Sequence, residues 1–254
     1  MSEGLRDRTV VVTGGARGQG LAVVQRLTAA GARVVAVDLD DAPELGVPGV
    51  RYRALDVADE AAWRALADEL RADGHGPVRG LVNNAGITHR ARVGEVERAA
   101  WERVLAVNLT GPLLAIQALA PLMAAGSSIV NIGSVAALSG HYPVAYTASK
   151  WGLRGLTHAA AGELGPRGIR VSIVHPGFIE TDMTASAPDA MRTAQRLITP
   201  LERTGEPDDV AAAVEFLLSD AARFVSGAEL TVDGGQASSA GAKVLSDRLR
   251  DSSD

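Results

Sequence analysis

Short apolar runs rich in β-branched residues alternate along this chain with longer segments in which apolar residues recur every three or four positions. The short runs predict buried strands, and the longer segments predict amphipathic helices. The predicted strands are residues 9–13, 33–37, 50–54, 78–82, 128–132, 169–174 and 230–232. The predicted helices are residues 21–30, 59–71, 96–107, 110–123, 146–164 and 207–218. This alternation predicts an α/β fold, in which one doubly wound, seven-stranded parallel sheet carries helices on both faces.

Two regions depart from this alternation. Residues 178–203 combine weak periodicity with several helix breakers, and we expect a mobile lid that contains short helices. Residues 236–254 are polar and serine-rich, which predicts a loose C-terminal tail. No linker or internal repeat marks a second unit, so residues 1–235 are expected to form a single domain.

Composition narrows the classes of function. The net charge is −5, and no basic block is present, which argues against a nucleic-acid-binding surface. The absence of cysteine removes disulfides, thiolate nucleophiles and cysteine metal ligands. The N-terminus is polar without a signal-peptide core, and no apolar run reaches the roughly 18 residues that span a bilayer. We therefore expect a cytoplasmic protein that does not bind membranes.

A glycine-rich turn joins the first predicted strand to the first helix. Gly14, Gly18 and Gly20 lie in this turn, and Asp38 ends the next strand. Glycines let the backbone approach a pyrophosphate, and a helix N-terminus offers free N–H groups to it. Asp38 can accept hydrogen bonds from ribose hydroxyls and would repel a 2′-phosphate, which predicts NAD(H) rather than NADP(H). Arg17, a cation in the same turn, is the counter-argument.

The fourth predicted strand runs into Asn83-Asn84-Ala85-Gly86. Ligands bind at the carboxyl ends of the strands in a parallel sheet, so these small and amide side chains are candidates for ligand binding. The amides could equally tie neighbouring strands together. The sequence leaves both roles open.

Tyr146 and Lys150 are four residues apart on a predicted helix, and therefore share one face. The chain has only two lysines, and the other, Lys243, lies in the polar tail. An ammonium beside a phenol favours the phenolate and lowers its pKa, which would make Tyr146 a general acid and base. Alone, such a pair could also be an exposed surface feature without a role.

Together these motifs resemble the short-chain dehydrogenase/reductase family, whose members have a Rossmann fold. The resemblance covers about residues 7–235. It depends on the joint occurrence, in this order, of Thr13-Gly-x-x-x-Gly18-x-Gly20, Asn83-Asn84-Ala85-Gly86, Asn108, Ser134 with Tyr146 and Lys150, and His175-Pro176-Gly177. Gln19 departs from the pattern, because the family usually carries an aliphatic residue there.

The resemblance implies roles for four catalytic residues. Tyr146 would protonate the substrate carbonyl oxygen, or accept the hydroxyl proton in the reverse direction. Lys150 would lower the pKa of Tyr146 and hold the nicotinamide ribose. Ser134 would donate a hydrogen bond to the reacting oxygen, and Asn108 would bind a water that relays protons to Lys150.

The resemblance also implies a cofactor site and no metal. Asp56 and Val57 would flank the adenine, and Thr181 would anchor the nicotinamide amide. The complete expected set of cofactor-binding residues is Gly14, Arg17, Gly18, Gln19, Gly20, Asp38, Asp56, Val57, Asn84, Ala85, Gly86, Tyr146, Lys150, Pro176, Gly177, Ile179 and Thr181.

The substrate pocket is expected to be largely apolar. Its predicted walls are residues 141–144 and 178–195, with apolar side chains at Ala136, Ala137, Leu138, Phe178, Ile179, Met183 and Met191. The methionines and leucine could equally be ordinary core residues. No arginine or lysine lies in 134–146, which favours a neutral, bulky carbonyl or secondary alcohol.

Within the family, residues 146–184 look most like the bacterial 3α(or 20β)-hydroxysteroid dehydrogenases, on the basis of Ser149-Lys150-Trp151-Gly152 and His175-Pro176-Gly177. The alternatives are an NADPH-dependent 3-oxoacyl carrier-protein reductase and a non-catalytic nucleotide-sensing regulator. Small apolar residues on the helices at 110–123 and 146–164, together with the family resemblance, predict a homotetramer.

Overall fold

A computed structural model of the chain describes residues 4–40, 45–74 and 76–251. Seven parallel strands form one sheet in the order β3-β2-β1-β4-β5-β6-β7. Their bounds are β1 Thr9–Thr13, β2 Arg33–Asp38, β3 Arg51–Ala54, β4 Val78–Asn83, β5 Met123–Ile132, β6 Arg170–Pro176 and β7 Glu229–Val232. The predicted doubly wound, seven-stranded α/β fold is confirmed. The strand order reverses direction between β1 and β4, and ligands bind at such a reversal in open α/β sheets.

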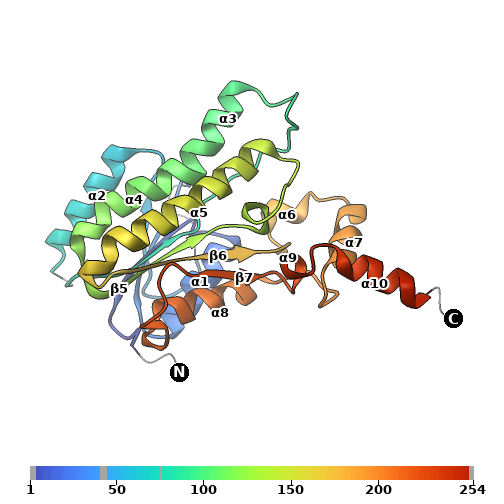
Figure 1. Ribbon diagram of the computed structural model, residues 1–254. Coiled ribbons are helices and arrows are strands. Elements are labelled where there is room, and N and C mark those ends of the chain that lie inside the picture. Colours follow the sequence, from blue (N-terminus) through green and yellow to red (C-terminus); the bar gives the residue numbers. More distant parts are fainter. Residues whose placement is uncertain (1–3, 41–44, 75, 252–254) are drawn as a thin grey trace.

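Side chains that alternate along each strand build two cores. Val11 of β1 enters one core with Trp63 and Leu66 of α2 (Glu60–Ala72), whereas Val10 and Val12 enter the other. The first core also contains α4 (Gly111–Leu119) and α5 (Val144–Leu164), and the second contains α1 (Gly18–Ala29) and α8 (Pro207–Leu218). The helices therefore cover both faces of the sheet (Figure 1).

The segment from 96 to 127 differs from the prediction of two helices separated at Asn108. α3 (Arg98–Leu105) continues through a π-helical turn, Ala106–Thr110, into α4 and a short 3-10 turn that ends at Leu122. β5 then begins at Met123, five residues before the predicted start, because Met123 pairs with Val78 ahead of a register shift. By length and apolarity the helical run Arg98–Leu122 could cross a bilayer, but half of its apolar window is buried inside the protein, as in a core helix.

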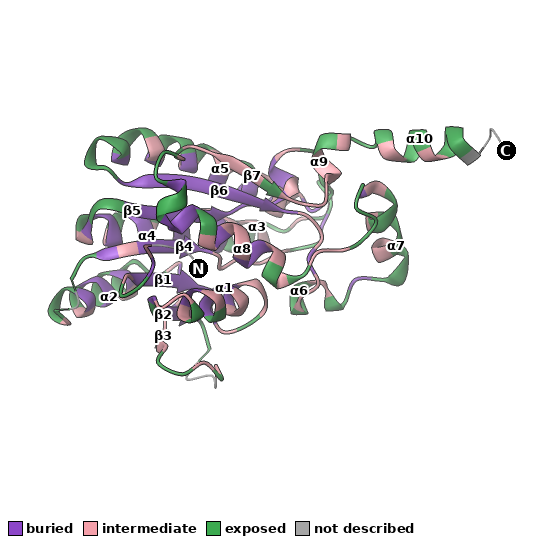
Figure 2. Cartoon of the chain, turned by 90° about the horizontal axis from the view of Figure 1, so that it is seen from below, coloured by how far each residue is buried: buried purple, intermediate pink, exposed green. Residues whose placement is uncertain are grey.

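Residues 178–203 contain α6 (Asp182–Ala185) and α7 (Asp189–Ile198), which lie beyond the ends of β6 and β7 (Figure 1). The expectation of a loose tail is wrong for its described part, residues 236–251. This part forms α9 (Gln236–Ser239) and α10 (Ala242–Asp251), and α10 extends away from the sheet with most of its surface exposed (Figure 2). Lys243 of α10 forms an ion pair with Glu202 at 3.0 Å, and a second one within the helix with Asp247 at 2.5 Å.

Candidate active site

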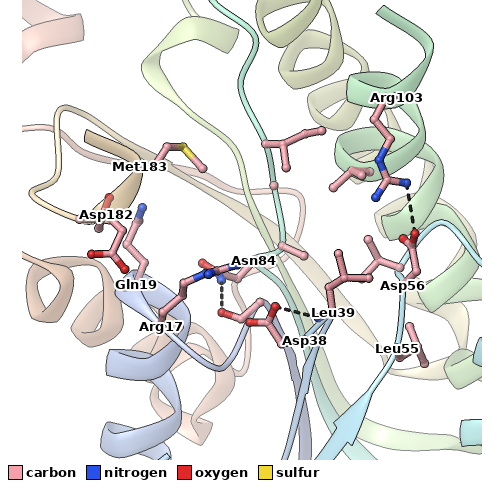
Figure 3. A pocket seen from close by; sticks show the side chains of 18 residues that line it. Arg17, Gln19, Asp38, Leu39, Leu55, Asp56, Asn84, Arg103, Asp182 and Met183 are labelled. Carbon is pink, nitrogen blue, oxygen red and sulfur yellow. Dashed lines mark hydrogen bonds and ion pairs between the residues drawn. The ribbon is translucent and has the colours of Figure 1, made fainter. Parts of the chain in front are cut away.

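A cavity of about 400 Å³ opens at the carboxyl ends of β1, β2 and β4, where the strand order reverses (Figure 3). Eleven of the predicted cofactor-binding residues line it: Gly14, Arg17, Gly18, Gln19, Asp38, Asp56, Val57, Asn84, Ala85, Gly86 and Thr181. Six do not line it: Gly20, Tyr146, Lys150, Pro176, Gly177 and Ile179. Seven further lining residues had not been predicted to bind the cofactor, although Asp182 and Met183 fall within the predicted substrate-pocket walls: Leu39, Leu55, Ile87, Arg103, Val107, Asp182 and Met183.

The glycine-rich turn is held tightly against the end of β4. Gly14 has a φ of +64°, and a Cβ on Gly20 would lie 1.9 Å from the carbonyl oxygen of Gly14, so neither position accepts a side chain. The Asn84 side-chain amide donates to the backbone oxygens of Thr13 and Gly14, at 3.0 and 3.2 Å. Asn84 thus ties two strands together, the structural role that the sequence left open, and it also lines the cavity.

Asp38 braces the same turn from the end of β2. Its carboxylate accepts hydrogen bonds from the backbone N–H of Ala16 at 3.0 Å and of Leu39 at 2.8 Å, and the residue is only 8% exposed. Arg17 lines the cavity (Figure 3). It also pairs with Asp40 at 3.4 Å. An acid therefore partly offsets the charge of Arg17, whereas the Asp38 carboxylate has no cation among the ion pairs of the described residues.

A second cavity, of about 330 Å³, contains the side chains of Ser134 and Tyr146. Met183 lines both cavities, so the two adjoin. Ala136, Phe178, Met183 and Met191 line the second cavity as predicted, whereas Ala137, Leu138, Val144 and Ile179 do not. Ala137 and Ile179 are instead buried in the protein interior.

The second cavity is more polar than predicted. Its walls include Thr88 and Arg90 from the loop after β4, Gln195 from α7, and Gln236 from the start of α9. Residues near 88 and 236 are far in sequence from 134–146, so the local segment could not reveal them. One sequence signal could have revealed Thr88 and Arg90, namely their position just after the Asn83–Gly86 motif.

Lys150 is buried behind this cavity, with 4% of its surface exposed. Its Nζ donates a 2.7 Å hydrogen bond to the Ile132 carbonyl and lies 5.7 Å from the centre of the Tyr146 ring. Burial lowers the pKa of Lys150 to about 8. Burial also raises the pKa of Tyr146, although the Ser134 side chain opposes that shift. The expected lowering of the Tyr146 pKa is therefore wrong for this state, because desolvation dominates and the ammonium binds a carbonyl rather than the phenol.

Asn108 occupies the π-helical turn and is completely buried. Its amide oxygen accepts from the Ile87 N–H at 2.8 Å, and its amide nitrogen donates to the Ile87 carbonyl at 2.9 Å and to Ser149 Oγ at 3.0 Å. A Cβ on Gly86 would lie 3.5 Å from Asn108 Oδ1 and 3.6 Å from Lys150 Nζ. Gly86, which lines the first cavity, therefore lies directly against the side chains of Asn108 and Lys150.

His175, completely buried at the end of β6, supports Ser134 from behind. Its Nδ1 lies 3.0 Å from the backbone oxygen and 3.3 Å from the backbone nitrogen of Ser134, and its Nε2 lies 3.2 Å from Glu229. Burial lowers the pKa of His175, so the ring is neutral at pH 7. The histidine of the His175-Pro176-Gly177 motif thus fixes the backbone that carries the serine.

Comparison with known proteins identifies the family. The family model described as enoyl-(acyl carrier protein) reductase matches residues 14–237. A 3-alpha-(or 20-beta)-hydroxysteroid dehydrogenase of Mycobacterium bovis is 42% identical over 92% of this chain and 91% of its own length. A D-threitol dehydrogenase of Mycolicibacterium smegmatis is 40% identical over 91% and 93% of the two chains. The chain belongs to the short-chain dehydrogenase/reductase family.

Solved structures superpose on more than nine-tenths of the chain. A short-chain dehydrogenase/reductase from Brucella melitensis, titled a glucose/ribitol dehydrogenase, matches with a TM-score of 0.87 and 33% identity, over 93% of this chain and 99% of that one. A blue fluorescent protein from a metagenomic library, in complex with NADPH, matches with a TM-score of 0.84 and 38% identity, over 91% and 98%. Like the family, this short-chain dehydrogenase/reductase is an oxidoreductase with a site for a nicotinamide cofactor.

The first cavity fits a nicotinamide dinucleotide. α1 begins at the cavity with glycines at Gly18 and Gly20, and none of its first-turn N–H groups is capped by the Arg17 side chain. Such a helix start favours the negative charge of a pyrophosphate. Gly86 lines the cavity next to Lys150, and Thr181 lines it next to Gly18. The cavity thus offers a helix N-terminus that suits a pyrophosphate and a carboxylate, Asp38, that suits ribose hydroxyls.

Proposed function

We propose that this short-chain dehydrogenase/reductase is an NAD(H)-dependent enzyme that interconverts a bulky secondary alcohol and the corresponding carbonyl compound. The observation that carries the proposal is the junction of the two cavities at Met183, with Ser134 and Tyr146 facing the second cavity and Lys150 buried behind them. When bound, the nicotinamide ring supplies or accepts the hydride.

The chain's own residues move and hold the proton. Tyr146 is protonated at neutral pH, since burial raises its pKa, and its phenol can donate to a carbonyl oxygen. Ser134 Oγ accepts from the Ala136 N–H at 3.1 Å, and its hydroxyl can donate to that oxygen and stabilise the charge that develops there. In oxidation Tyr146 must release its proton, and Lys150, with a pKa of about 8, can share the charge that results. Asn108 holds the loop at Ile87 next to this group, where a proton-relaying water would bind.

The preference for NAD(H) depends on Asp38. A 2′-phosphate beside this buried carboxylate would place like charges together in a region of low dielectric. Arg17 could attract such a phosphate, but it is paired with Asp40. A bulky alcohol fits a cavity of about 330 Å³ and the names of the relatives, among them a hydroxysteroid dehydrogenase.

A parallel screen tests the proposal. Steroids, cyclic alcohols and a 3-oxoacyl thioester are offered with NAD(H) and with NADP(H), while absorbance of the reduced nicotinamide is followed. We expect NAD-linked turnover of a bulky secondary alcohol, reduced at least about a thousandfold in Tyr146→Phe, which lacks the transferable proton. NADPH-linked reduction of the thioester would instead identify a carrier-protein reductase. Tight cofactor binding without turnover of any substrate would favour a nucleotide-sensing regulator.

A further inference from the structure

We infer that the substrate carries a second hydroxyl group, away from the reacting carbon, and that the side-chain amides of Gln195 and Gln236 bind it. The inference rests on the proposed function, because it names a feature of the substrate that enters the Tyr146 cavity. Both glutamines line that cavity, and the side-chain oxygen of each is buried without a hydrogen-bond partner among residues 4–40, 45–74 and 76–251. A buried amide oxygen without a partner is costly, and such groups are normally paired.

Gln195 is the polar member of an otherwise apolar helix face. Met191, Gln195 and Ile198 are spaced by four and three residues along α7, and all three line the cavity. A leucine at 195 would complete an apolar wall. The amide instead places a polar group inside the cavity, and the backbone oxygen of Gln195 is already bonded to the Thr199 side chain at 2.7 Å.

Gln236 reaches the cavity from the other side, across the end of β6. Asp233 accepts from the N–H groups of Gly235 at 2.9 Å and Ala237 at 2.7 Å, which fixes the turn that carries Gln236. A Cβ on Gly177 would lie 3.4 Å from Gln236 Oε1. The side-chain oxygen of Gln236 therefore lies next to Gly177, the residue that follows β6.

A hydroxyl is the group that best matches these two amides. It donates one hydrogen bond and accepts two, so it pairs with an amide whichever way the oxygen and nitrogen are turned. A purely apolar substrate would leave both amides unpaired, and a carboxylate offers no donor to an amide oxygen. The one cation in the cavity, Arg90, contacts the Met183 carbonyl and Ser186 Oγ at 3.4 Å. Ser134 and Tyr146 take the reacting oxygen, so the glutamines need a separate hydroxyl.

The test compares cyclohexanol with the cyclohexanediol isomers, which have the same ring with one or two hydroxyls. We expect kcat/KM with NAD to be about 10- to 100-fold higher for the best diol than for cyclohexanol, the usual penalty for leaving a buried polar group unpaired. This ratio should fall towards one in Gln195→Leu and in Gln236→Leu. Gln25→Leu, an exposed glutamine on α1, is the matched control and should keep the wild-type ratio. The ratio is measured within one preparation, so it does not depend on the fraction of a variant that folds.

A ratio near one in the wild type, or a ratio that neither leucine variant changes, would overturn the inference. If no alcohol is turned over, ligand binding tests the inference instead. The melting temperature of NAD-saturated Tyr146→Phe is then measured with diol and with cyclohexanol. A diol-specific stabilisation lost in the glutamine variants would then support the hydroxyl site while the proposed reaction fails. Equal stabilisation by the diol and by cyclohexanol, with no turnover of any alcohol, would contradict both the hydroxyl site and the proposed reaction.

Discussion

Burial governs the ionisation of the two groups that carry the proposed chemistry. Lys150 is buried and Tyr146 is partly buried, and desolvation disfavours the ammonium of the one and the phenolate of the other. In the protein without cofactor, Lys150 therefore has a pKa of about 8, because burial destabilises its charged form. A charge with this cost is expected at a functional position rather than at a structural one.

We predict that Lys150→Met stabilises the cofactor-free protein at pH 7 while it abolishes turnover. The folded pKa of about 8 lies below the ordinary value of 10.5, so between these values the unfolded chain binds more protons, and stability rises with pH. Below about pH 8, Lys150 is charged in both the folded and the unfolded protein, so the buried charge destabilises the folded protein by its full amount. Loss of the hydrogen bond to Ile132 offsets part of the gain, so we expect about 1–3 kcal/mol in urea unfolding.

The pH dependence separates this effect from simple repacking. The advantage of Lys150→Met should shrink as the pH rises from 8 towards 10, because the wild-type lysine then loses its charge. A variant less stable than the wild type at pH 7, or an advantage that does not change with pH, would contradict the prediction.

Substitution of Asp38 tests the proposed preference for NAD(H) over NADP(H). Its carboxylate faces the first cavity with 8% exposure, so removing it removes a poorly screened like charge. We expect Asp38→Ala to lower the ratio of kcat/KM for NAD to that for NADP by about 10- to 100-fold. The side chain of Asp40 is 55% exposed, so Asp40→Ala is the control and should change the ratio less than about threefold. An unchanged ratio in Asp38→Ala would contradict the proposed preference.

At the scale of elements, the π-helical turn between α3 and α4 is the irregularity that serves the site. π-helical turns are rare and occur mostly at functional sites. This turn directs Asn108 to the loop after β4, where the amide satisfies both backbone groups of Ile87. One side chain thus joins α4, α5 and the end of β4 next to Lys150.

Asn108→Ala should therefore destabilise the protein as well as reduce activity. It leaves the Ile87 N–H and carbonyl unpaired in a partly buried region, for an expected loss of about 1–3 kcal/mol in urea unfolding. Gln25→Ala, at an exposed position on α1, should change stability by less than about 0.5 kcal/mol. A loss in Asn108→Ala as small as that of the control would show that the amide does not hold the loop.

The whole molecule exposes apolar side chains on the outer surfaces of α4 and α5. Leu113 of α4 is 38% exposed and Trp151 of α5 is 46% exposed. We predict that these two helices pair with those of other subunits in a homotetramer of four 26.2 kDa chains, measured by light scattering. The double variant Leu113→Glu and Trp151→Glu should reduce the mass to that of a dimer or monomer, because it buries charge at the contact. Gln25→Glu adds charge elsewhere and should leave the mass unchanged; a monomeric wild type would refute the prediction.

The sequence by itself determined the order of strands and helices and the positions of the main motifs. Buried parallel strands must be apolar, and helices on the sheet must be amphipathic. The local sequence therefore predicts the strand at residues 9–13 and the helix at residues 207–218. The glycine turn, Asp38, Ser134 and Tyr146 could be found for the same reason, since each motif occupies a few adjacent positions next to a predictable strand or helix.

Only the tertiary structure decided properties that depend on residues far apart in the chain. The pKa directions of Tyr146 and Lys150 follow from how completely the surrounding elements exclude water, which no local pattern records. Gln195 of α7 and Gln236 of α9 line one cavity, although they lie in different helices and are far apart in the sequence. The π-helical turn at Asn108 likewise follows from its contact with Ile87, a side-chain to backbone contact across 21 residues of sequence.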